Sequence, residues 1–426
     1  MTERDAAWKR VCDALPVAEA LERGGIFPIG ADDLKRHGGR EPRLMAKIDT
    51  LAERPAALAA MEAALFPVRN GRYVLFPDPD RKSFHRFEGE PPAPRAFAAR
   101  IDTVRFETLP RGQEPSESQA LDMAHLAGLL AHFCGEASLC LTLRGRMFSG
   151  DFAFRTPLRG LPVEVSRVQI EIDGGYEGER GIYLIEAKRG RRDDFHIRQL
   201  WYPWLHWSAR AQKRVVPLFF TYSNGQYELS EFAFGPGFGE IELVRRKAYC
   251  LEEPLAEADF KSLFARIPEG PEPPVAFPQA NDLDKVADLA RLAAEAPRDK
   301  AMIAEAFGFD ERQGDYYGNA GCYLGLLRRG EEGFASTPAG ESFSRLRSRP
   351  ARTLALLEAM LAVPSLREAL RLLAERRFRA EKIATGELAA VVRGAAGLGA
   401  TTPERRASTL RAWLGWVMRN VKVRDV

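Results

Sequence analysis

The sequence predicts a multidomain protein of mixed α/β (α+β) class, with a mixed central segment between two helix-rich flanks. The chain has 426 residues, of which 45% are hydrophobic, and this fraction is typical of packed globular domains rather than disordered or fibrous chains. Prolines cluster over residues 77–95 and 267–278, where they prevent a regular helix and mark connectors. We therefore expect domains over residues 1–95, 96–266 and 279–426.

The central segment alternates helical and strand patterns. Apolar residues recur at helical spacing after Ser116, a residue type that favours the N-cap of a helix. A second helix is expected over 193–208, where Pro203 should cause a kink or a boundary. The expected strands cover residues 139–143, 163–173, 182–188, 215–222 and 227–234. The last two strands meet at Asn224-Gly225, a pair typical of tight hairpin turns.

The C-terminal flank reads as three short helices followed by a hairpin. We expect helices over 281–296, capped by Asn281, over 300–307, and after Asp310, which can cap the third helix. The hairpin follows over 328–337. This order indicates a winged helix, whose third helix would enter the major groove of DNA. The alternative is a helical domain that only stabilises a dimer.

Several polar residues of this flank are candidates for DNA contacts. The polar face of the third helix carries side chains able to contact base edges or phosphates, namely Arg312, Gln313, Asp315 and Asn319. The last helix begins at Pro403 and places Arg405 and Arg406 along a possible phosphate backbone. In the N-terminal flank, helical patterns over 44–51 and 56–65 precede a strand over 72–76 and a tight turn at Gly71. We interpret this flank as a helix-plus-wing region that recognises DNA.

The charge distribution agrees with binding to a polyanion. The net charge of the whole chain is only +3, but residues 311–426 carry 20 basic and 12 acidic side chains, which gives +8, and residues 1–310 carry −5. A basic domain is the usual electrostatic signature of binding to a phosphate backbone. The alternative is that arginine-rich helices only solvate a surface.

The sequence indicates a cytoplasmic protein. No run approaches the ~18 apolar residues of a membrane span, and residues 1–10 contain no apolar signal-peptide region. The five cysteines are scattered and lack the paired spacing of a zinc site. This pattern is typical of reduced thiols in a cytoplasm.

Two acidic residues and a lysine form the main candidate site. Asp173 lies at the end of one expected strand, and Glu186 and Lys188 lie at the end of the next. Residues two apart on a strand point to the same face, so these three groups can converge. Carboxylate oxygens bind Mg²⁺, which polarises a phosphoryl oxygen, and a lysine can orient or deprotonate water. The alternative is a set of alternating charges on the solvated face of a hairpin, although the apolar Leu184-Ile185 pair before them is typical of a buried strand.

The motif IEID…IEAK (residues 170–188) resembles the PD-(D/E)XK nucleases, whose core has the order αβββαβ. The resemblance implies that Asp173 and Glu186 are metal ligands, with Ala187 as a backbone-carbonyl ligand and Lys188 as the catalytic lysine. It also implies that Glu117, from the first helix, joins the metal shell and that Gln199 lies beside the site. Ile172 stands where many members of the superfamily have proline.

Over most of its length the chain also resembles a group of prokaryotic type II restriction endonucleases. The matching segments are REPRLMAKIDT, VRNGRYVLFP, SESQALDMA, GRMFSGDFAF, VQIEIDGGYE, IYLIEAKRGRRDDFHIRQLWYPW and DERQGDYYGNAGCYLGLL. The resemblance implies Mg²⁺-dependent, sequence-specific cleavage of double-stranded DNA by a homodimer, with a cognate DNA methyltransferase as genetic partner. The alternatives are a structure-specific or modification-dependent nuclease and a non-catalytic DNA-binding regulator.

Three further features of the central segment have less specific interpretations. Arg146, Ser149 and Asp151 are candidates for contacts to the scissile backbone, with a simple turn as the alternative. His196 is expected to be a surface or packing residue rather than a metal ligand. The tryptophans of the second central helix recur at helical spacing and are expected in the core.

Overall fold

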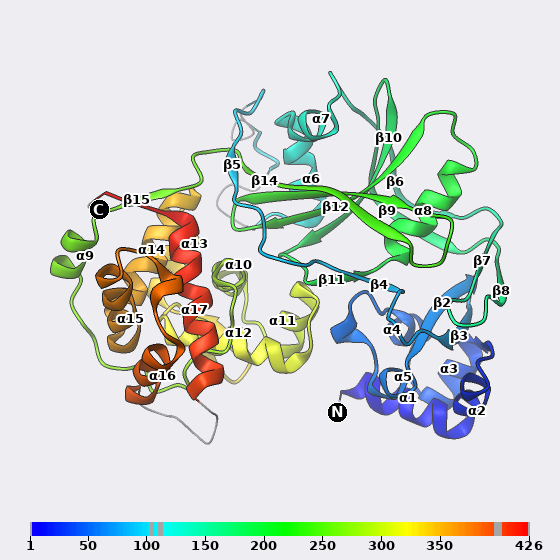
Figure 1. Cartoon of the computed structure of the whole chain (residues 1–426), viewed down its shortest axis with the longest axis horizontal. Helices are drawn as coiled ribbons and strands as arrows, with labels where there is room; N and C mark the ends of the chain where they lie inside the picture. Colours follow the sequence, from blue (N-terminus) through cyan, green and yellow to red (C-terminus); the bar gives the residue numbers. More distant parts are fainter. Residues whose placement is uncertain (1, 102–105, 110–113, 396–402, 425–426) are drawn as a thin grey trace.

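The computed structural model describes residues 2–101, 106–109, 114–395 and 403–424. Within these ranges the chain is a mixed α/β protein with several sheets (Figure 1). In Figure 1 the C-terminal helices lie at the left, the central sheet at the upper right and the N-terminal unit at the lower right. The class expected from the sequence is thus confirmed at this level.

A seven-stranded sheet forms the central part. Its strands, in spatial order, are β5 (Arg95–Ala96), β14 (Ile241–Cys250), β13 (Gln226–Phe234), β12 (Arg214–Ser223), β10 (Gly181–Arg189), β9 (Gln169–Glu177) and β6 (Cys140–Phe148). Strands β10 and β12 are parallel and are joined by helix α8 (Arg198–Ser208), whereas β6, β9 and β10 are antiparallel neighbours. The β12–β13 hairpin turns at Asn224 and Gly225, both with positive φ, as predicted.

Helices cover both faces of this sheet. Helices α6 (Glu117–Leu126) and α7 (Leu129–Cys134) pack against one face, where Tyr183, Ile185 and Ala187 of β10 lie in the core. Helix α8 packs on β9, β10 and β12, and its Trp204 contacts the cluster that contains Leu184. Because side chains alternate along a strand, Glu186 and Lys188 point to the same side as Leu184, toward α8.

Two expectations for this part were wrong. The strand expected over 163–173 is divided into β8 (Pro162–Val165), which pairs with β7 (Phe152–Arg155), and β9, because Arg167 adopts a positive φ between them. The helix expected from residue 193 begins only at Arg198, since β11 (Asp194–His196) pairs with β4 (Phe84–Arg86). Helix α8 continues through Pro203, so this residue does not form the boundary that was one of the two outcomes expected there.

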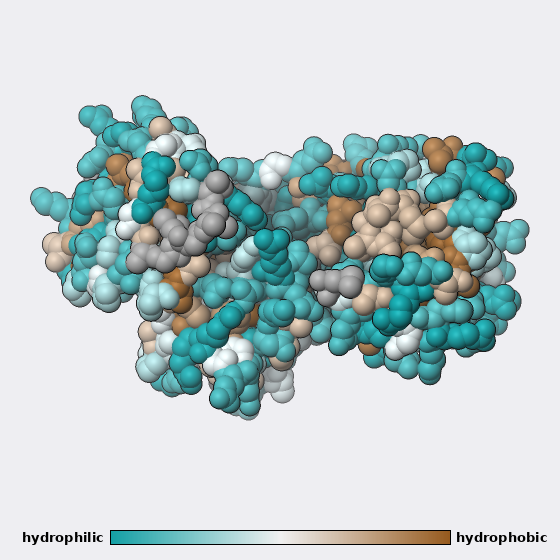
Figure 2. Space-filling view, turned by 90° about the horizontal axis from the view of Figure 1, so that it is seen from below, coloured by the Kyte–Doolittle hydropathy of each residue, from teal (hydrophilic) through white to brown (hydrophobic). Residues whose placement is uncertain are grey.

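The N-terminal unit combines short helices with a three-stranded sheet of order β1 (Phe27–Gly30), β3 (Arg72–Pro77), β2 (Ala63–Arg69). Its helices are α1 (Glu3–Ala14), α2 (Val17–Glu22), α3 (Ala31–Gly38), α4 (Pro42–Ala46), η1 (Leu51–Glu53) and α5 (Ala56–Ala60). The helix expected to reach residue 65 ends at Ala60, because the next residues belong to β2. Figure 2 shows an apolar patch on the face that this unit turns to the viewer. Within α5, Ala56, Ala59 and Ala60 are exposed.

The C-terminal lobe has one continuous hydrophobic core. Helices α10 (Leu283–Glu295), α11 (Lys300–Phe307) and α12 (Glu311–Tyr323) precede the hairpin of β16 (Leu327–Gly330) and β17 (Gly333–Ser336). The remaining elements are β15 (Ala256–Ala258), α9 (Phe260–Arg266), α13 (Pro338–Ser344), α14 (Arg349–Ala362), α15 (Pro364–Glu375), η3 (Ala380–Lys382), α16 (Thr385–Gly394), α17 (Pro403–Asn420) and β18 (Val421–Val423). Asp310 caps α12 as predicted, but α10 is capped by Asp282 rather than by Asn281.

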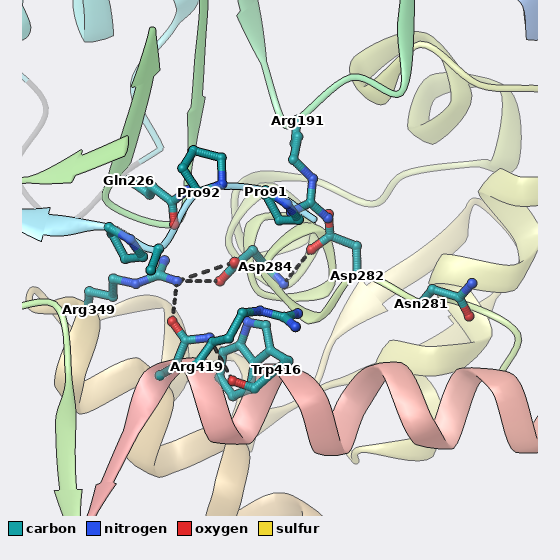
Figure 3. Close-up of a pocket in the computed structure, with 13 residues that line it drawn as sticks. Pro91, Pro92, Arg191, Gln226, Asn281, Asp282, Asp284, Arg349, Trp416 and Arg419 are labelled. Atoms are coloured by element: carbon teal, nitrogen blue, oxygen red, sulfur yellow. Dashed lines mark hydrogen bonds and ion pairs between the residues drawn. The ribbon is translucent and has the colours of Figure 1, made fainter. Parts of the chain in front are cut away.

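A polar junction joins this lobe to the central sheet (Figure 3). The guanidinium group of Arg349 is buried there, pairs with Asp284, and donates hydrogen bonds to Asn420 Oδ1 and to the carbonyl oxygen of Asn224 in the β12–β13 turn. Arg191, which follows β10, pairs with Asp282 at 2.8 Å. Since these bonds join α10, α14 and α17 to the sheet, they fix the position of the C-terminal lobe.

Among the described residues, no helix has the combination of length and apolar character that spanning a membrane requires.

Candidate functional site

A cleft of about 680 Å³ lies where the three parts of the chain meet. The central sheet contributes Asp173, Glu186 and Lys188 to its lining, the N-terminal unit contributes residues between Arg43 and Tyr73, and the C-terminal lobe contributes Glu305 and Gly308. Every acidic residue that the sequence assigned to the metal shell lines this cleft. The candidate site is therefore not a property of the central sheet alone.

Glu186 and Lys188 form the centre of the site at the end of β10. Glu186 is 8% exposed, and its Oε1 accepts hydrogen bonds from Lys188 Nζ and, at 2.6 Å, from Gln199 Nε2. Gln199 comes from the first turn of α8. The helix that connects two parallel strands thus orients the carboxylate on the strand before it.

Asp173 reaches the same place from the neighbouring strand. Gly174 pairs with Ile185 in the β9–β10 register, so Asp173 lies beside Glu186. Its Oδ2 accepts a hydrogen bond from the backbone N–H of Ala187 at 2.8 Å. The sequence placed Asp173 at the end of its strand, whereas it lies within β9, which continues to Glu177.

Glu117 approaches from the opposite layer. It is the first residue of α6, directly after the N-cap Ser116, whose side chain accepts a hydrogen bond from Gln119 N–H. Glu117 Oε1 accepts a hydrogen bond from the backbone N–H of Arg189 at 2.9 Å, just beyond Lys188. This bond places a third carboxylate around the end of β10, and the role of Glu117 in a metal shell stays a prediction.

Burial and mutual repulsion control the protonation of these groups. The pKa of Glu186 is raised to about 8, mainly by burial and also by the neighbouring Asp173, although Lys188 opposes the shift. Burial also raises the pKa of Asp173. Burial alone would lower the pKa of Lys188, but the carboxylates of Glu186, Glu117, Asp49 and Asp173 raise it above its ordinary value. Lys188 is thus a cation held among acids.

The donor chemistry of the site fits a hard divalent cation. The hydrogen bonds that hold Asp173 and Glu186 use one oxygen atom of each carboxylate, so the other oxygen can serve as a ligand. Gln199 Oε1 is buried beside them without a hydrogen-bond partner among the described residues. The same residues include no group of three or more His, Cys, Asp or Glu already placed to hold a metal ion. A cation would offset the repulsion that raises the two pKa values.

The wall of the cleft that the N-terminal unit provides is basic. Its exposed polar side chains are those of Arg43, Lys47, Arg69 and Asn70. Sequence reasoning did not single out these residues, because their neighbours across the cleft are more than 45 positions away in the chain. The available signal was their presence in REPRLMAKIDT and VRNGRYVLFP, two segments of the resemblance to restriction endonucleases.

The other central candidates divide into exposed and buried residues. Arg146 lines the cleft and pairs with Glu171 at 3.2 Å. Ser149 is buried, and its hydroxyl oxygen accepts a hydrogen bond from Val168 N–H, so it supports a turn. Asp151 accepts a hydrogen bond from Ser166 Oγ at 2.7 Å. His196 is buried between Phe66 and Phe84 and is a packing residue, as expected.

The candidates of the C-terminal lobe lie outside the cleft. Arg312 and Gln313 are exposed on α12, with Arg312 Nε donating to Tyr316 Oη at 2.7 Å. Asn319 is half-buried and donates to Asp315 Oδ2 at 3.0 Å. Arg405 is exposed, whereas Arg406 is 4% exposed. A guanidinium group buried in this way is not placed to contact a phosphate.

Comparison with protein families divides the chain into three matched segments. Residues 5–75 match a family described as Domain of unknown function (DUF6996), residues 80–250 match Domain of unknown function (DUF6997), and residues 285–422 match Domain of unknown function (DUF7226). The candidate carboxylates and Lys188 lie within the second segment, and the basic wall lies within the first. A search of curated proteins and a search of solved structures found no match.

Proposed function

We propose that this protein is a Mg²⁺-dependent endonuclease that cleaves double-stranded DNA at specific sequences, as type II restriction enzymes do. The observation that carries the proposal is the convergence of Asp173, Glu186 and Lys188 in one cleft, with Gln199 bonded to Glu186. A buried carboxylate, that of Glu186, next to the half-buried Asp173 and a lysine is costly without a function, because each charge loses hydration.

The order of elements around these residues supports the proposal. Helix α6 precedes the antiparallel strands β6, β9 and β10, and α8 then leads to β12, which runs parallel to β10. With α7, β7, β8 and β11 as additional elements, this order agrees with the one expected for the αβββαβ core of the PD-(D/E)XK nucleases. The candidate residues occupy the second and third strands of that order, where the superfamily carries its motif.

Each side chain would have a distinct role. Asp173, Glu186 and the carbonyl group of Ala187 would hold Mg²⁺, with Glu117 as an additional acid, and the bound ion would supply Lewis-acid polarisation of a phosphoryl oxygen. Lys188 would orient the attacking water and offset charge on the pentavalent transition state. Gln199 would keep the Glu186 carboxylate in the orientation that the ligand needs.

DNA would enter between the carboxylates and the basic wall. Lys47 and Arg69 of the N-terminal unit and Arg146 of β6 line the same cleft and would contact phosphates. Helices α10 to α12 and the β16–β17 hairpin would form a winged-helix-like reader, with Arg312 and Gln313 toward the bases. Cleavage of both strands favours a homodimer, and a cytoplasmic restriction enzyme would need a DNA methyltransferase that protects the host.

The test is digestion of plasmid DNA by the full chain with Mg²⁺ and with a chelator. We expect cleavage only with Mg²⁺, and we expect Glu186→Ala and Lys188→Ala to lose cleavage while they still bind DNA. A parallel digestion of methylated plasmid separates a restriction enzyme from a modification-dependent nuclease. Cleavage retained by either variant would contradict the site assignment.

A further inference from the structure

One short segment of the N-terminal unit contacts both other parts of the molecule beside the cleft. The backbone N–H of Leu51 donates to Asp194 Oδ1 at 2.7 Å, and Thr50 Oγ1 donates to the carbonyl oxygen of Gly308 at 3.1 Å. Within the segment, Glu53 Oε2 accepts from the N–H groups of Asp49 and Thr50. These bonds hold residues 49–53 in a fixed position against strand β11 and the C-terminal end of α11.

Asp49 makes two contacts at the start of α8. Its carbonyl oxygen accepts a hydrogen bond from the N–H of His196 at 2.7 Å, and its carboxylate pairs with Arg198 at 3.2 Å. The side chains of this pair are 20% and 24% exposed, so the pair is largely shielded from water. Arg198 is the first residue of α8, and the next residue is Gln199.

The start of α8 depends on these contacts. Its N-cap residue, Ile197, has no side chain that can accept a hydrogen bond from the first turn. The available acceptor is instead His196 Nδ1, which receives the N–H of Arg198 at 3.2 Å. Because both His196 and Arg198 are bonded to Asp49, the first turn of α8 is fixed from the N-terminal unit.

We propose that Asp49 is a positioning residue of the candidate site: it fixes the first turn of α8 so that Gln199 holds the Glu186 carboxylate in its working orientation. This inference rests on the proposed function. It makes the N-terminal unit part of the catalytic apparatus, in addition to any role in contacting DNA. The negative charge of Asp49 also acts on Lys188 and Glu186, which agrees with its place beside the cleft.

The test compares Asp49→Asn with Asp13→Asn in the full chain. Asp13 belongs to the same unit and also forms an ion pair, with Lys9, but its side chain is 61% exposed and does not line the cleft. For Asp49→Asn we expect the single-turnover rate with saturating enzyme and Mg²⁺ to fall about 10- to 100-fold, the usual effect of losing one charged hydrogen bond. We expect the Kd for DNA to change less than about 3-fold, and Asp49→Glu to recover part of the rate.

A second measurement needs neither metal nor DNA. Hydrogen exchange of the peptide that covers residues 198–204 should become faster in Asp49→Asn and stay unchanged in Asp13→Asn. In a double-mutant cycle, the protein with both Asp49→Asn and Arg198→Ala should lose no more of the single-turnover rate than the more impaired single variant does.

The outcomes separate this inference from the proposed function. If Glu186→Ala is inactive but Asp49→Asn cleaves at the wild-type rate, the positioning role is wrong and the proposed function stands. If Asp49→Asn weakens DNA binding and keeps the saturated rate, Asp49 is a binding residue and the positioning role is wrong. If the wild-type protein shows no Mg²⁺-dependent cleavage, both proposals are wrong. Unchanged exchange over residues 198–204 would also contradict the positioning role.

Discussion

At the scale of single residues, Glu186 and Lys188 could be predicted as neighbours from the sequence because residues two apart on a strand share a face. Their hydrogen bond agrees with this reasoning. Gln199 came only from the resemblance to a nuclease superfamily. The pair of Asp49 and Arg198 could not be predicted, because 149 positions separate these residues and neither has a local pattern that indicates a partner.

His85 gives a prediction about pH and stability. Its ring packs against Phe87, Phe195 and Phe232, its Nε2 is buried with no hydrogen-bond partner in the described part of the chain, and burial lowers its pKa to about 4. The unfolded chain has an ordinary histidine pKa and takes up a proton first as the pH falls. His85 therefore destabilises the fold increasingly between about pH 6.5 and pH 4.

We expect His85→Phe to remove this part of the acid sensitivity. The free energy of unfolding of the variant should exceed that of the wild type by about 1–2 kcal/mol more at pH 4.5 than at pH 7.5, allowing for screening at a partly exposed ring. Denaturant titrations at the two pH values measure this difference. Asp194, whose pKa burial raises to about 6, acts with the opposite sign in both proteins and cancels in the comparison. If the variant and the wild type differ in the free energy of unfolding by the same amount at both pH values, His85 is not the source of the acid sensitivity.

At the scale of elements, the sequence predicted the helices and strands whose residue pattern is local. The β12–β13 hairpin follows from two apolar runs joined by Asn224-Gly225, and α12 follows from its Asp310 cap. Strand β11 was taken for the start of a helix, because its pairing with β4 depends on a segment about 110 residues earlier. Strand β14 was missed, since four of its first seven residues are charged, a composition that hides the apolar pattern of a strand.

Helix α12 contains glycines that helix propensity alone does not explain. A Cβ atom at Gly318 would lie 2.2 Å from the ring of Phe334 in β17, and one at Gly314 would lie 2.2 Å from the carbonyl oxygen of Lys300 in α11. The glycines therefore allow α12 to pack closely on both α11 and the hairpin. Their role is in packing, whereas the polar face of the same helix carries the candidate DNA contacts.

We expect Gly318→Ala to destabilise the protein by about 1–3 kcal/mol, although alanine favours helices, because the new methyl group overpacks the contact with Phe334. Gly386→Ala is the matched control in α16, where a Cβ atom would meet nothing within 4 Å. That variant should be neutral or more stable by up to about 1 kcal/mol. Thermal unfolding of both variants measures the effects. A Gly318→Ala protein that is as stable as the wild type would show that α12 does not depend on this close packing.

At the scale of the whole molecule, the net charge of the C-terminal part overstates the charge available to a ligand. Several arginines are buried in structural roles, namely Arg349, Arg352, Arg367 and Arg406. Arg367, for example, donates hydrogen bonds to the carbonyl oxygens of Ile267, Leu361 and Phe264. A basic wall that faces the carboxylates comes instead from the N-terminal unit, which the division of charge along the sequence did not reveal.

The salt dependence of DNA binding tests whether this basic wall contacts phosphates. Replacing both Lys47 and Arg69 by alanine should weaken binding and lower the slope of log K against log salt by about 2, since each phosphate contact contributes about 0.9. The control is the Lys9→Ala/Arg23→Ala protein, which loses two exposed cations of the same unit that do not line the cleft. Equal slopes for the two double variants would contradict a phosphate-binding role for the wall.

The most direct test of the account is sequencing of the fragment ends that the full chain produces from unmethylated plasmid with Mg²⁺, compared with Lys188→Ala at equal concentration. We predict discrete ends that share one short sequence for the wild type, and intact plasmid for Lys188→Ala. Ends without a common sequence would contradict specific recognition. The same ends from both proteins, or no cleavage by the wild type, would contradict the catalytic role of the cleft.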